Sequence, residues 1–365
     1  MIVFLTPRES MYTIEGTLQR PEYVALQSRF RVVAWEAFFE RPELPAGSCV
    51  FTALDQLTPT GRDVAARCRD LMLQAAPGAR MLNDPLKTLR RFDLLRAAFD
   101  SGQNRFRVSR ATAAPGRHRY PVFVRCEHEH SGSLTPPLHS PTALRRALAI
   151  AVLRGYHLRD LLVVEHVDAA SPDGVYRKYA AYSVGDRVIP RCVEVSPSWV
   201  TKDDDRIITE ATMQEDRSYV TANPHRKWLS DIFRMANVGY GRADYGIVDG
   251  TPQLWEINLA PTIGAGPPTR IRHTNRTAEQ REMLTPMREY FHRHFEAAFE
   301  AIDHEPDPAA TVTVPISPAE RAALRRESRA LQRIRARDTA VSRLVRPSLR
   351  LLRTMTRALR PRSGP

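Results

Sequence analysis

The sequence predicts an α/β (α+β) fold with a parallel N-terminal subdomain and a basic helical C-terminal tail. Three observations support this prediction. Short apolar runs alternate with helical periodicity over about the first hundred residues. Two later segments have the alternating pattern and the turn residues of β-hairpins. Arginine is concentrated after residue 318, where it surrounds scattered leucines.

The N-terminal elements follow one another in the order that a parallel sheet requires. Apolar runs predict strands at residues 1–6, 30–37 and 48–54. Helical periodicity with a capping residue predicts a helix over 60–76. A short strand ends at 81–84, and Pro85 is expected to open a helix that continues to Phe99. Strands that alternate with helices in this way predict parallel pairing.

Bulk properties exclude several classes of protein. The chain has no apolar run long enough to cross a membrane. The opening run Met1–Thr6 is too short for a signal peptide. The four cysteines lie far apart and form no CxxC pair, as expected for buried free thiols in a reducing compartment. We therefore expect a cytoplasmic protein.

The positive charge of the chain belongs to its tail. Of the net charge of +13, residues 319–365 contribute about +11, so the remaining body is close to neutral. The tail predicts a basic amphipathic segment, which could place the protein peripherally on an anionic membrane or bind an acidic partner. A solvated, partly disordered tail is the alternative. Nucleic acid is a poor partner, because the tail lacks interleaved aromatic residues.

Residues 242–258 predict two strands joined at Asp249-Gly250-Thr251. A three-residue or bulged turn would set Asp244 opposite Glu256. Glu256 and Asn258 are two residues apart, so they share a face, whereas Trp255 and Ile257 point the other way into a core. The oxygen-rich cluster of Asp244, Glu256 and Asn258, with Arg242 beside it, suits Mg²⁺ held together with nucleotide phosphates. An ordinary solvated hairpin is the alternative.

The segment from Arg242-Ala-Asp244 to Glu256-Ile-Asn258-Leu-Ala-Pro261 resembles the metal-binding end of the ATP-grasp superfamily. The proteins it is similar to include D-alanine–D-alanine ligase, glutathione synthetase and ribosomal-protein glutamate ligases. Elements with a similar pattern run from about residue 81 to 265 in the expected order. The resemblance implies an ATP-grasp fold and an enzyme that uses ATP and Mg²⁺, with Mn²⁺ as the alternative metal.

The resemblance also implies phosphate ligands in the first lobe. Lys87 follows Asn83-Asp84-Pro85, where family members place a phosphate-binding lysine, and a solvent-facing lysine is the alternative. Pro121–Arg125 resembles a strand that usually ends in lysine, and here Arg125 keeps the charge as a planar fork. The segment 127–133 would be a polar loop over the phosphates. Its two histidines and two glutamates could suggest a zinc site, but they alternate on a loop without cysteine, so a flexible polar loop is the better interpretation.

The strand 161–168 resembles the hinge that lines the adenine pocket. There the backbone of Glu165, His166 and Val167 would contact adenine, and Asp168 or Glu165 would hold the ribose hydroxyls. A core strand that reaches the surface is the alternative. The next hairpin turns at Gly185-Asp186, and its Lys178 or Arg177 would reach the phosphates; Lys178 is preferred because lysine is rare here.

The expected domains are an N-terminal subdomain (1–80), a nucleotide-binding lobe (81–170), a metal-binding lobe (171–304), a Pro-rich linker (305–318) and the tail (319–365). Helices are expected within 206–237 and over 278–303, the latter with an aromatic core stripe.

The resemblance implies a ligase that activates a carboxylate as an acylphosphate and joins it to an amine or thiol. Arg242 and Lys178 would stabilise the transferring phosphoryl group. The substrates would be small carboxylates and amines held near Thr262 and Gly264. A kinase-like phosphotransferase and a catalytically silent binding module remain alternatives, and the oligomeric state stays open.

Overall fold

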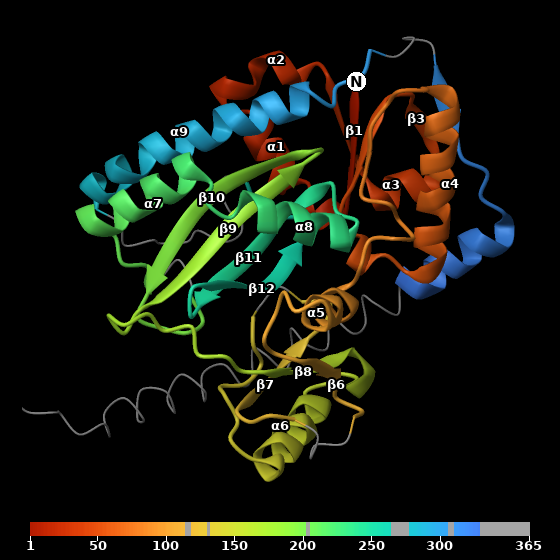
Figure 1. The fold of residues 1–365 in the computed structure, drawn as a ribbon. Coiled ribbons are helices and arrows are strands. Elements are labelled where there is room, and N and C mark those ends of the chain that lie inside the picture. The colour runs from red at the N-terminus through yellow and green to blue at the C-terminus, as the bar shows by residue number, and fades with distance from the viewer. Residues whose placement is uncertain (114–117, 130–131, 202–204, 264–276, 306–309, 329–365) are drawn as a thin grey trace, which may run out of the picture.

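The computed structural model describes the chain except residues 114–117, 130–131, 202–204, 264–276, 306–309 and 329–365. Figure 1 shows an N-terminal unit on one side, a four-stranded antiparallel sheet with its helices on the other, and a small lobe below both. The predicted α/β fold class with a parallel N-terminal subdomain is confirmed.

The N-terminal unit is built on a parallel sheet of order β2-β1-β4-β5. Strand β1 (Ile2–Thr6) is fully buried, as its apolar sequence predicts. The others are β2 (Phe30–Ala34), β4 (Ser48–Phe51) and β5 (Met81–Leu82), with helices α1 (Tyr12–Leu18), α2 (Val24–Gln27), α3 (Trp35–Glu40) and α4 (Pro59–Ala75). Helix α4 begins as predicted, because the Thr58 hydroxyl accepts a hydrogen bond from the Gly61 amide.

The small lobe contains an antiparallel sheet of order β6-β8-β7. Its strands are β6 (Val108–Arg110), β7 (Val122–Cys126) and β8 (Leu161–Glu165). Helix α6 (Pro141–Leu153) covers the sheet from below in Figure 1, and α5 (Arg91–Asp100) lies between this lobe and the rest of the molecule. The lobe therefore has its own small core, which includes Val124, Leu144 and Leu148.

The largest sheet is antiparallel, with order β10-β9-β11-β12. Its strands are β9 (Tyr176–Val184), β10 (Arg187–Ser196), β11 (Tyr240–Val248) and β12 (Thr251–Asn258), and its helices are α7 (Glu210–Ala222), α8 (Arg226–Ala236) and α9 (Ala278–Glu300). The predicted hairpin at Gly185-Asp186 is present, the predicted helical region 206–237 contains α7 and α8, and the helix predicted over 278–303 is α9. On α9, Phe291, Phe295 and Phe299 are fully buried, so the aromatic stripe is core, as expected.

Helices α7 and α8 pack on one face of this sheet, and α9 packs on part of the other face. Tyr219 of α7 and Trp228 of α8 pack on Tyr245, which lies on one face of the sheet. On the other face, α9 packs through Phe291 and Phe295 on Tyr182, at one end only. The remainder of that second face carries polar side chains and looks toward the small lobe (Figure 1).

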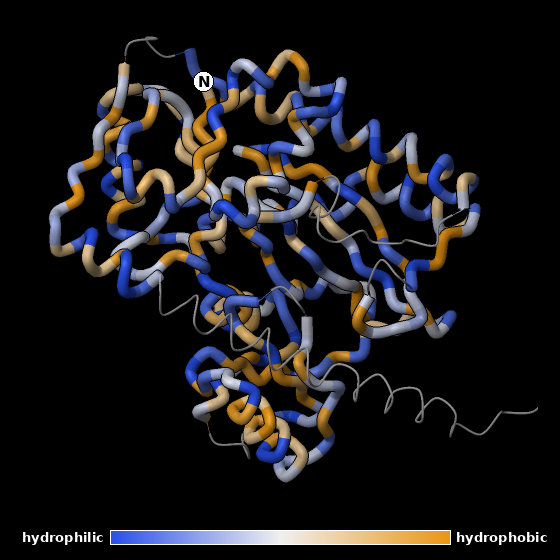
Figure 2. Tube along the Cα trace, turned by 180° about the vertical axis from the view of Figure 1, so that it is seen from behind, coloured by the Kyte–Doolittle hydropathy of each residue, from blue (hydrophilic) through white to orange (hydrophobic). Residues whose placement is uncertain are grey.

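One hydrophobic core runs from the parallel sheet into the antiparallel sheet and the top of the small lobe. Figure 2 shows hydrophobic segments in the N-terminal unit and in the small lobe, whereas the strands of the large sheet have mixed hydropathy. Asn83 fixes the junction, because its side chain donates to the carbonyls of Phe51 and Tyr240 and accepts from the amides of Gly239 and Tyr240. All its hydrogen-bonding capacity is used in a buried position.

Part of the segment expected as a linker, 305–318, is a strand, and the first described part of the tail is helical, which is one of its two expected states. Residues Thr311–Thr313 form β13, which pairs with β3 (Glu43–Pro45) of the N-terminal unit. Residues 318–328 are helical and contact α4 through Glu320, which pairs with Arg67, and through buried Leu324. Alternating Thr and Val drive the strand pairing, a signal that the surrounding prolines hid. The rest of the tail lies outside the described residues.

Two element boundaries differ from the prediction. The helix expected from Pro85 begins at Arg91, because the Asp84 carboxylate accepts hydrogen bonds from the amides of Leu86 and Lys87 and holds a turn there. The strand expected over 30–37 ends at Ala34, after which α3 begins. The sequence pattern therefore predicted where these elements lie more accurately than it predicted the residues at which they begin and end.

The four cysteines are free, and three of them are buried, as predicted. In the part of the chain that the structure describes, no helix combines the length and the hydropathy needed to span a bilayer.

Candidate functional site

The hairpin of β11 and β12 places Asp244 directly opposite Glu256, as predicted. The turn is tight, since Asp249 and Gly250 both have positive φ angles of 47° and 73°. The irregularity lies further along, where Trp255 bulges out of β12 between the partners of Asp244 and Tyr245. A bulge therefore brings the two carboxylates into register, and it lies in the strand rather than in the turn.

The polar residues of this sheet share one face. Asp244 pairs with Ala180 of β9, and Arg242 pairs with Tyr182, so both alternate in step with Lys178. Lys178 in turn pairs with Glu194 of β10. The face left open by α9 consequently carries an ordered row of charged and amide side chains: Glu194, Lys178, Arg242, Asp244, Glu256 and Asn258.

Two ion pairs lie along this row. The Lys178 ammonium lies 2.7 Å from the Glu194 carboxylate, and the Arg242 guanidinium forms two hydrogen bonds of 2.6 and 2.8 Å with Asp244. Burial acts to lower the pKa of Lys178, but Glu194 and Asp244 outweigh it and raise that pKa. Burial likewise acts to raise the pKa of Glu194, and Lys178 more than reverses this. The Lys178–Glu194 pair therefore stays charged at neutral pH.

Glu256 lies between two buried arginines from outside its own sheet. Its Oε2 accepts from Arg91 Nη2 at 2.9 Å and from Arg125 Nη2 at 2.5 Å. Arg91 opens α5, and Arg125 lies on β7 of the small lobe. Burial and the neighbouring Arg91 lower the pKa of Arg125, although Glu256 opposes this. Two buried guanidiniums thus converge on one carboxylate, which gives this place an excess of positive charge.

Arg91 also holds the segment that follows β7. Its Nη1 donates to the carbonyl oxygens of Cys126, Glu127 and Glu129 at 3.0, 2.5 and 2.8 Å. The sequence reasoning missed this residue and selected Lys87 instead. The Lys87 side chain is 72% exposed and lies 3.9 Å from Asp84 in the turn before α5. The sequence prediction began this helix at Pro85. Recognising that the helix begins at Arg91 could have identified this residue.

The oxygen ligands of the row suit a metal ion bound together with an anion better than they suit a metal ion alone. The row and its two visiting arginines contain four cationic and three anionic side chains, so they carry one positive charge in excess. Asn258 Oδ1 accepts from the Ala260 amide at 2.9 Å. Among the described residues, no group of three or more His, Cys, Asp or Glu could hold a metal. Asp244, Glu256 and Asn258 would supply oxygens of the hard type that Mg²⁺ prefers, once phosphate satisfied the arginines.

The strand expected over 161–168 is present as β8, and the Glu165 carboxylate at its end is bound within the protein. Its carboxylate accepts from the amides of Arg107 and Arg119 and from the Arg119 guanidinium. It is buried, and it organises the small lobe, so the expected contact of Glu165 with ribose is wrong for this arrangement. Asp168 is exposed and accepts from the Ala170 amide.

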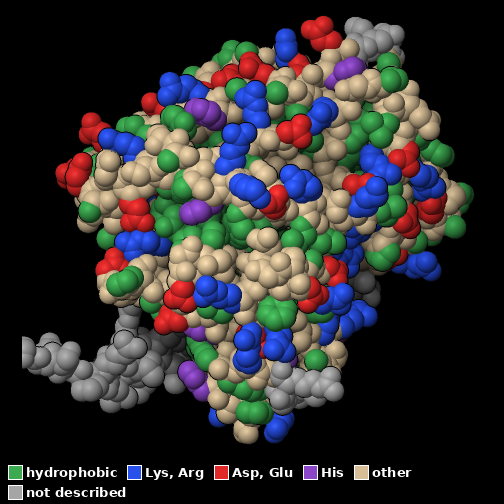
Figure 3. Space-filling model, viewed as in Figure 1, with side chains coloured by type: hydrophobic (Ala, Val, Ile, Leu, Met, Phe, Trp, Pro, Cys, Tyr) green, Lys and Arg blue, Asp and Glu red, His purple; other side chains and the backbone are tan. Residues whose placement is uncertain are grey.

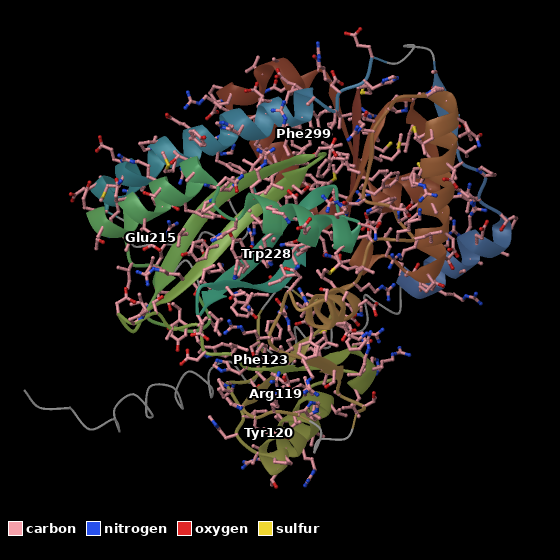
Figure 4. All side chains as sticks on the ribbon, in the orientation of Figure 1. Arg119, Tyr120, Phe123, Glu215, Trp228 and Phe299 are labelled. Carbon is pink, nitrogen blue, oxygen red and sulfur yellow. The ribbon has the colours of Figure 1, made fainter. Side chains whose placement is uncertain are left out.

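His166 and Val167 continue the hinge beyond β8. The His166 amide donates to Pro121, and its ring meets Trp199 edge-on at 5.2 Å. Trp199 also meets Phe123 at 5.3 Å. Figure 4 places Phe123 on the side of the small lobe toward the large sheet, and Tyr120 toward its far end. Half-buried aromatic rings and the apolar Val167 therefore adjoin the hinge backbone, as a planar base would require.

The two loops expected to cover the site are only partly described. Glu127, at the start of the first loop, is buried and paired with Arg110, so this end is anchored rather than free. His128 lies 3.9 Å from Glu127 and Asp160. Residues 130–131 and Gly264 with the loop that follows lie outside the described residues. The Thr262 carbonyl accepts from the Tyr182 hydroxyl at 2.9 Å.

No family model and no curated protein matches the chain. Among solved structures, it is similar to D-alanine–D-alanine ligase from Bacillus anthracis, with 11% identity, coverage of 81% of this chain and 98% of that one, and a TM-score of 0.43. It is also similar to the RimK domain protein ATP-grasp from Sphaerobacter thermophilus (15%, covering 72% and 92%, TM-score 0.39) and L-amino acid ligase from Bacillus licheniformis (12%, 85% and 78%, 0.43).

Proposed function

We propose that this protein is an ATP- and Mg²⁺-dependent ligase that joins a small carboxylate to an amine or thiol. The observation that carries the proposal is the convergence of Arg91 and Arg125 on Glu256, which faces Asp244 across the β11–β12 pair. Buried arginines that place an excess of positive charge beside carboxylates of metal-ligand type suit a magnesium polyphosphate.

The residues of the row have distinct roles in this proposal. Arg91, Arg125, Lys178 and Arg242 bind phosphate oxygens and stabilise the charge that spreads over the transferring phosphoryl group. Asp244, Glu256 and Asn258 hold the metal. When bound, Mg²⁺ neutralises phosphate charge and aligns the nucleotide.

The pairing of Lys178 with Glu194 keeps the lysine protonated and fixed. Lys178 therefore acts as a fixed cation for the phosphate and not as a base.

A ligase suits the row better than a reaction that needs a protein base. Each acid of the row is bound to a cation: Asp244 to Arg242, Glu194 to Lys178 and Glu256 to two arginines. A substrate carboxylate is already ionised at neutral pH, so it can attack the γ-phosphate without proton removal. This attack forms an acylphosphate as ADP leaves. An amine or thiol can then displace phosphate from the acylphosphate, which forms an amide or thioester and releases inorganic phosphate and a proton.

The other wall of the substrate pocket is proposed to be the carboxyl edge of the parallel sheet. In the order β2-β1-β4-β5 the chain changes direction between β1 and β4, the place where open α/β sheets bind ligands. Just beyond β4, the Ala53 amide donates to the carbonyl of Leu259, the residue after Asn258. This contact supports a substrate site that adjoins the proposed phosphate site.

The test is phosphate release from ATP with a panel of small carboxylates, each with and without added amino acids or thiols. We expect release that requires Mg²⁺, one acid and one nucleophile, with a coupled product detected by mass spectrometry. Glu256→Gln should abolish it, and Glu215→Gln, which alters a half-exposed acid on α7, should not. A phosphorylated acid without coupling would indicate a phosphotransferase. Absence of nucleotide binding would overturn the proposal in favour of a binding module.

A further inference from the structure

Helix α6 has an apolar outer face at its C-terminal end. Its inner side is formed by Leu144, Leu148 and Ala151, which are buried against the small-lobe sheet. The opposite side would be polar in an ordinary surface helix. Instead, Ile150 is 40% exposed and Leu153 is 84% exposed, and they lie three residues apart on one side of the helix.

The exposed apolar residues of the described chain cluster at this place. Seven large hydrophobic side chains are exposed in the described part of the chain, and four of these seven lie within residues 150–158. Val152, at 44%, and Leu158, at 40%, join Ile150 and Leu153. Single exposed apolar residues are normal, whereas a contiguous group marks an interaction surface. We call the group Ile150, Val152, Leu153 and Leu158 the tip patch.

The charges around the tip patch are almost all positive. Arg145 and Arg146 are exposed on α6, and Arg159 is exposed beside Leu158. Arg154 follows Leu153 directly, and no Asp or Glu occurs between residues 130 and 159. Two acids adjoin this region: Asp160 is 28% exposed, with His128 at 3.9 Å and Arg159 at 3.8 Å, and the Glu129 carboxylate accepts from the Tyr156 hydroxyl at 3.4 Å. In Figure 3, hydrophobic and basic side chains cover the lower end of the small lobe.

We propose that the tip patch docks this protein onto an anionic phospholipid surface. Apolar side chains at a convex helix end can enter the acyl boundary of a bilayer, while the arginines around them bind lipid phosphates. A second copy of the chain would bring the same positive ring against itself, which like charges oppose. Helix α6 lies on the side of the small lobe away from the large sheet (Figure 1), so docking leaves the row of charged residues accessible.

The test is sedimentation of the full-length protein with phosphatidylcholine vesicles and with vesicles that also contain phosphatidylglycerol. We expect binding to the anionic vesicles only, which weakens as salt is added. Leu153→Asp should weaken binding about tenfold or more, because it removes one inserted side chain and adds a repelled charge. Val24→Asp places the same change at a 63% exposed site on α2 and should leave binding unchanged.

Charge reversal separates the two contributions. Arg145→Glu with Arg146→Glu should weaken binding to anionic vesicles and leave the thermal unfolding midpoint near that of the wild type. The proposal is overturned if the full-length protein does not sediment with anionic vesicles. It is also overturned if Leu153→Asp binds as well as Val24→Asp, because binding would then arise elsewhere. The outcome is independent of nucleotide turnover, so it tests the tip patch and not the proposed ligase activity.

Discussion

Arg91 and Glu256 are 165 residues apart in sequence, and their side chains meet at 2.9 Å. Arg91 opens α5, next to the small lobe, whereas Glu256 lies on the edge strand of the large sheet. Because the same arginine holds the carbonyls of Cys126, Glu127 and Glu129, it connects the loop after β7 with the proposed metal ligand. A ligand that changes the charge state around Glu256 must therefore act on this loop.

Replacing Arg91 by alanine should weaken MgATP binding by roughly 10- to 100-fold, since a charge-assisted hydrogen bond contributes about 1.5–3 kcal/mol. Arg91→Lys should recover part of this loss, because it keeps the charge and not the fork. Isothermal titration calorimetry measures both. The matched control is Arg96→Ala, on the same helix, whose side chain is 62% exposed. Equal affinities for the Arg91→Ala and Arg96→Ala variants would exclude Arg91 from the nucleotide site.

Mg²⁺ alone should bind the free protein weakly or not at all. The proposed ligands are occupied by arginines, and the row carries an excess positive charge, so a bare cation meets repulsion. With ATP or a non-hydrolysable analogue, the phosphates satisfy the arginines and the metal binds. Calorimetric titration of Mg²⁺ with and without nucleotide compares the two states. Tight binding of Mg²⁺ to the nucleotide-free protein would contradict this order.

Local patterns predicted the hairpin that carries Asp244 and Glu256, because alternation and Asp-Gly are read from neighbouring residues. They did not predict Arg91 or Glu194, whose partners come from other elements. They misassigned the Glu165 carboxylate to a ligand, since nothing near it in sequence reveals that Arg119 folds back onto it. Pairing of β13 with β3 was hidden for the same reason.

Glu194→Gln should destabilise the fold by about 1–3 kcal/mol, because it leaves the largely buried Lys178 ammonium without its carboxylate. Lys178→Met combined with Glu194→Gln should recover part of this loss, since no uncompensated charge remains. Urea-induced unfolding monitored by tryptophan fluorescence measures the free energy of unfolding of each variant. If the double variant is no more stable than Glu194→Gln alone, the uncompensated Lys178 charge is not the cause of the loss.

Asn83→Ala should be among the most damaging single substitutions, with a loss of about 3–5 kcal/mol. It removes four buried hydrogen bonds, and each unsatisfied group costs about 1–3 kcal/mol. Its φ of 67° adds strain for alanine. Asn223→Ala is the matched control, because Asn223 has a φ of 46° and donates one side-chain bond, to Val188. It should cost about 1–2 kcal/mol.

The stability of the fold should fall with decreasing pH through His292 on α9. This ring is fully buried, its Nδ1 lies 2.6 Å from the Tyr23 hydroxyl, and burial, with Arg20 and Arg191 nearby, lowers its pKa to about 3. The unfolded chain binds a proton at His292 near pH ~6.5, whereas the folded chain does not. The contribution of His292 to the free energy of unfolding is therefore complete above about pH 6.5, and it is lost progressively as the pH falls to about pH 3.

The expected loss between about pH 6.5 and about pH 5 is roughly 1–2 kcal/mol from this one group. His292→Gln keeps a polar partner for Tyr23 and removes the titrating ring. The unfolding free energy of this variant should therefore fall less steeply with decreasing pH than that of the wild type, and the difference in slope should correspond to nearly one bound proton. Urea unfolding across this range compares the two slopes. His294→Gln alters an exposed ring on the same helix and serves as the control. If His292→Gln and wild type share one slope, the buried ring is protonated in the folded state, and Tyr23 then accepts its proton rather than donating one.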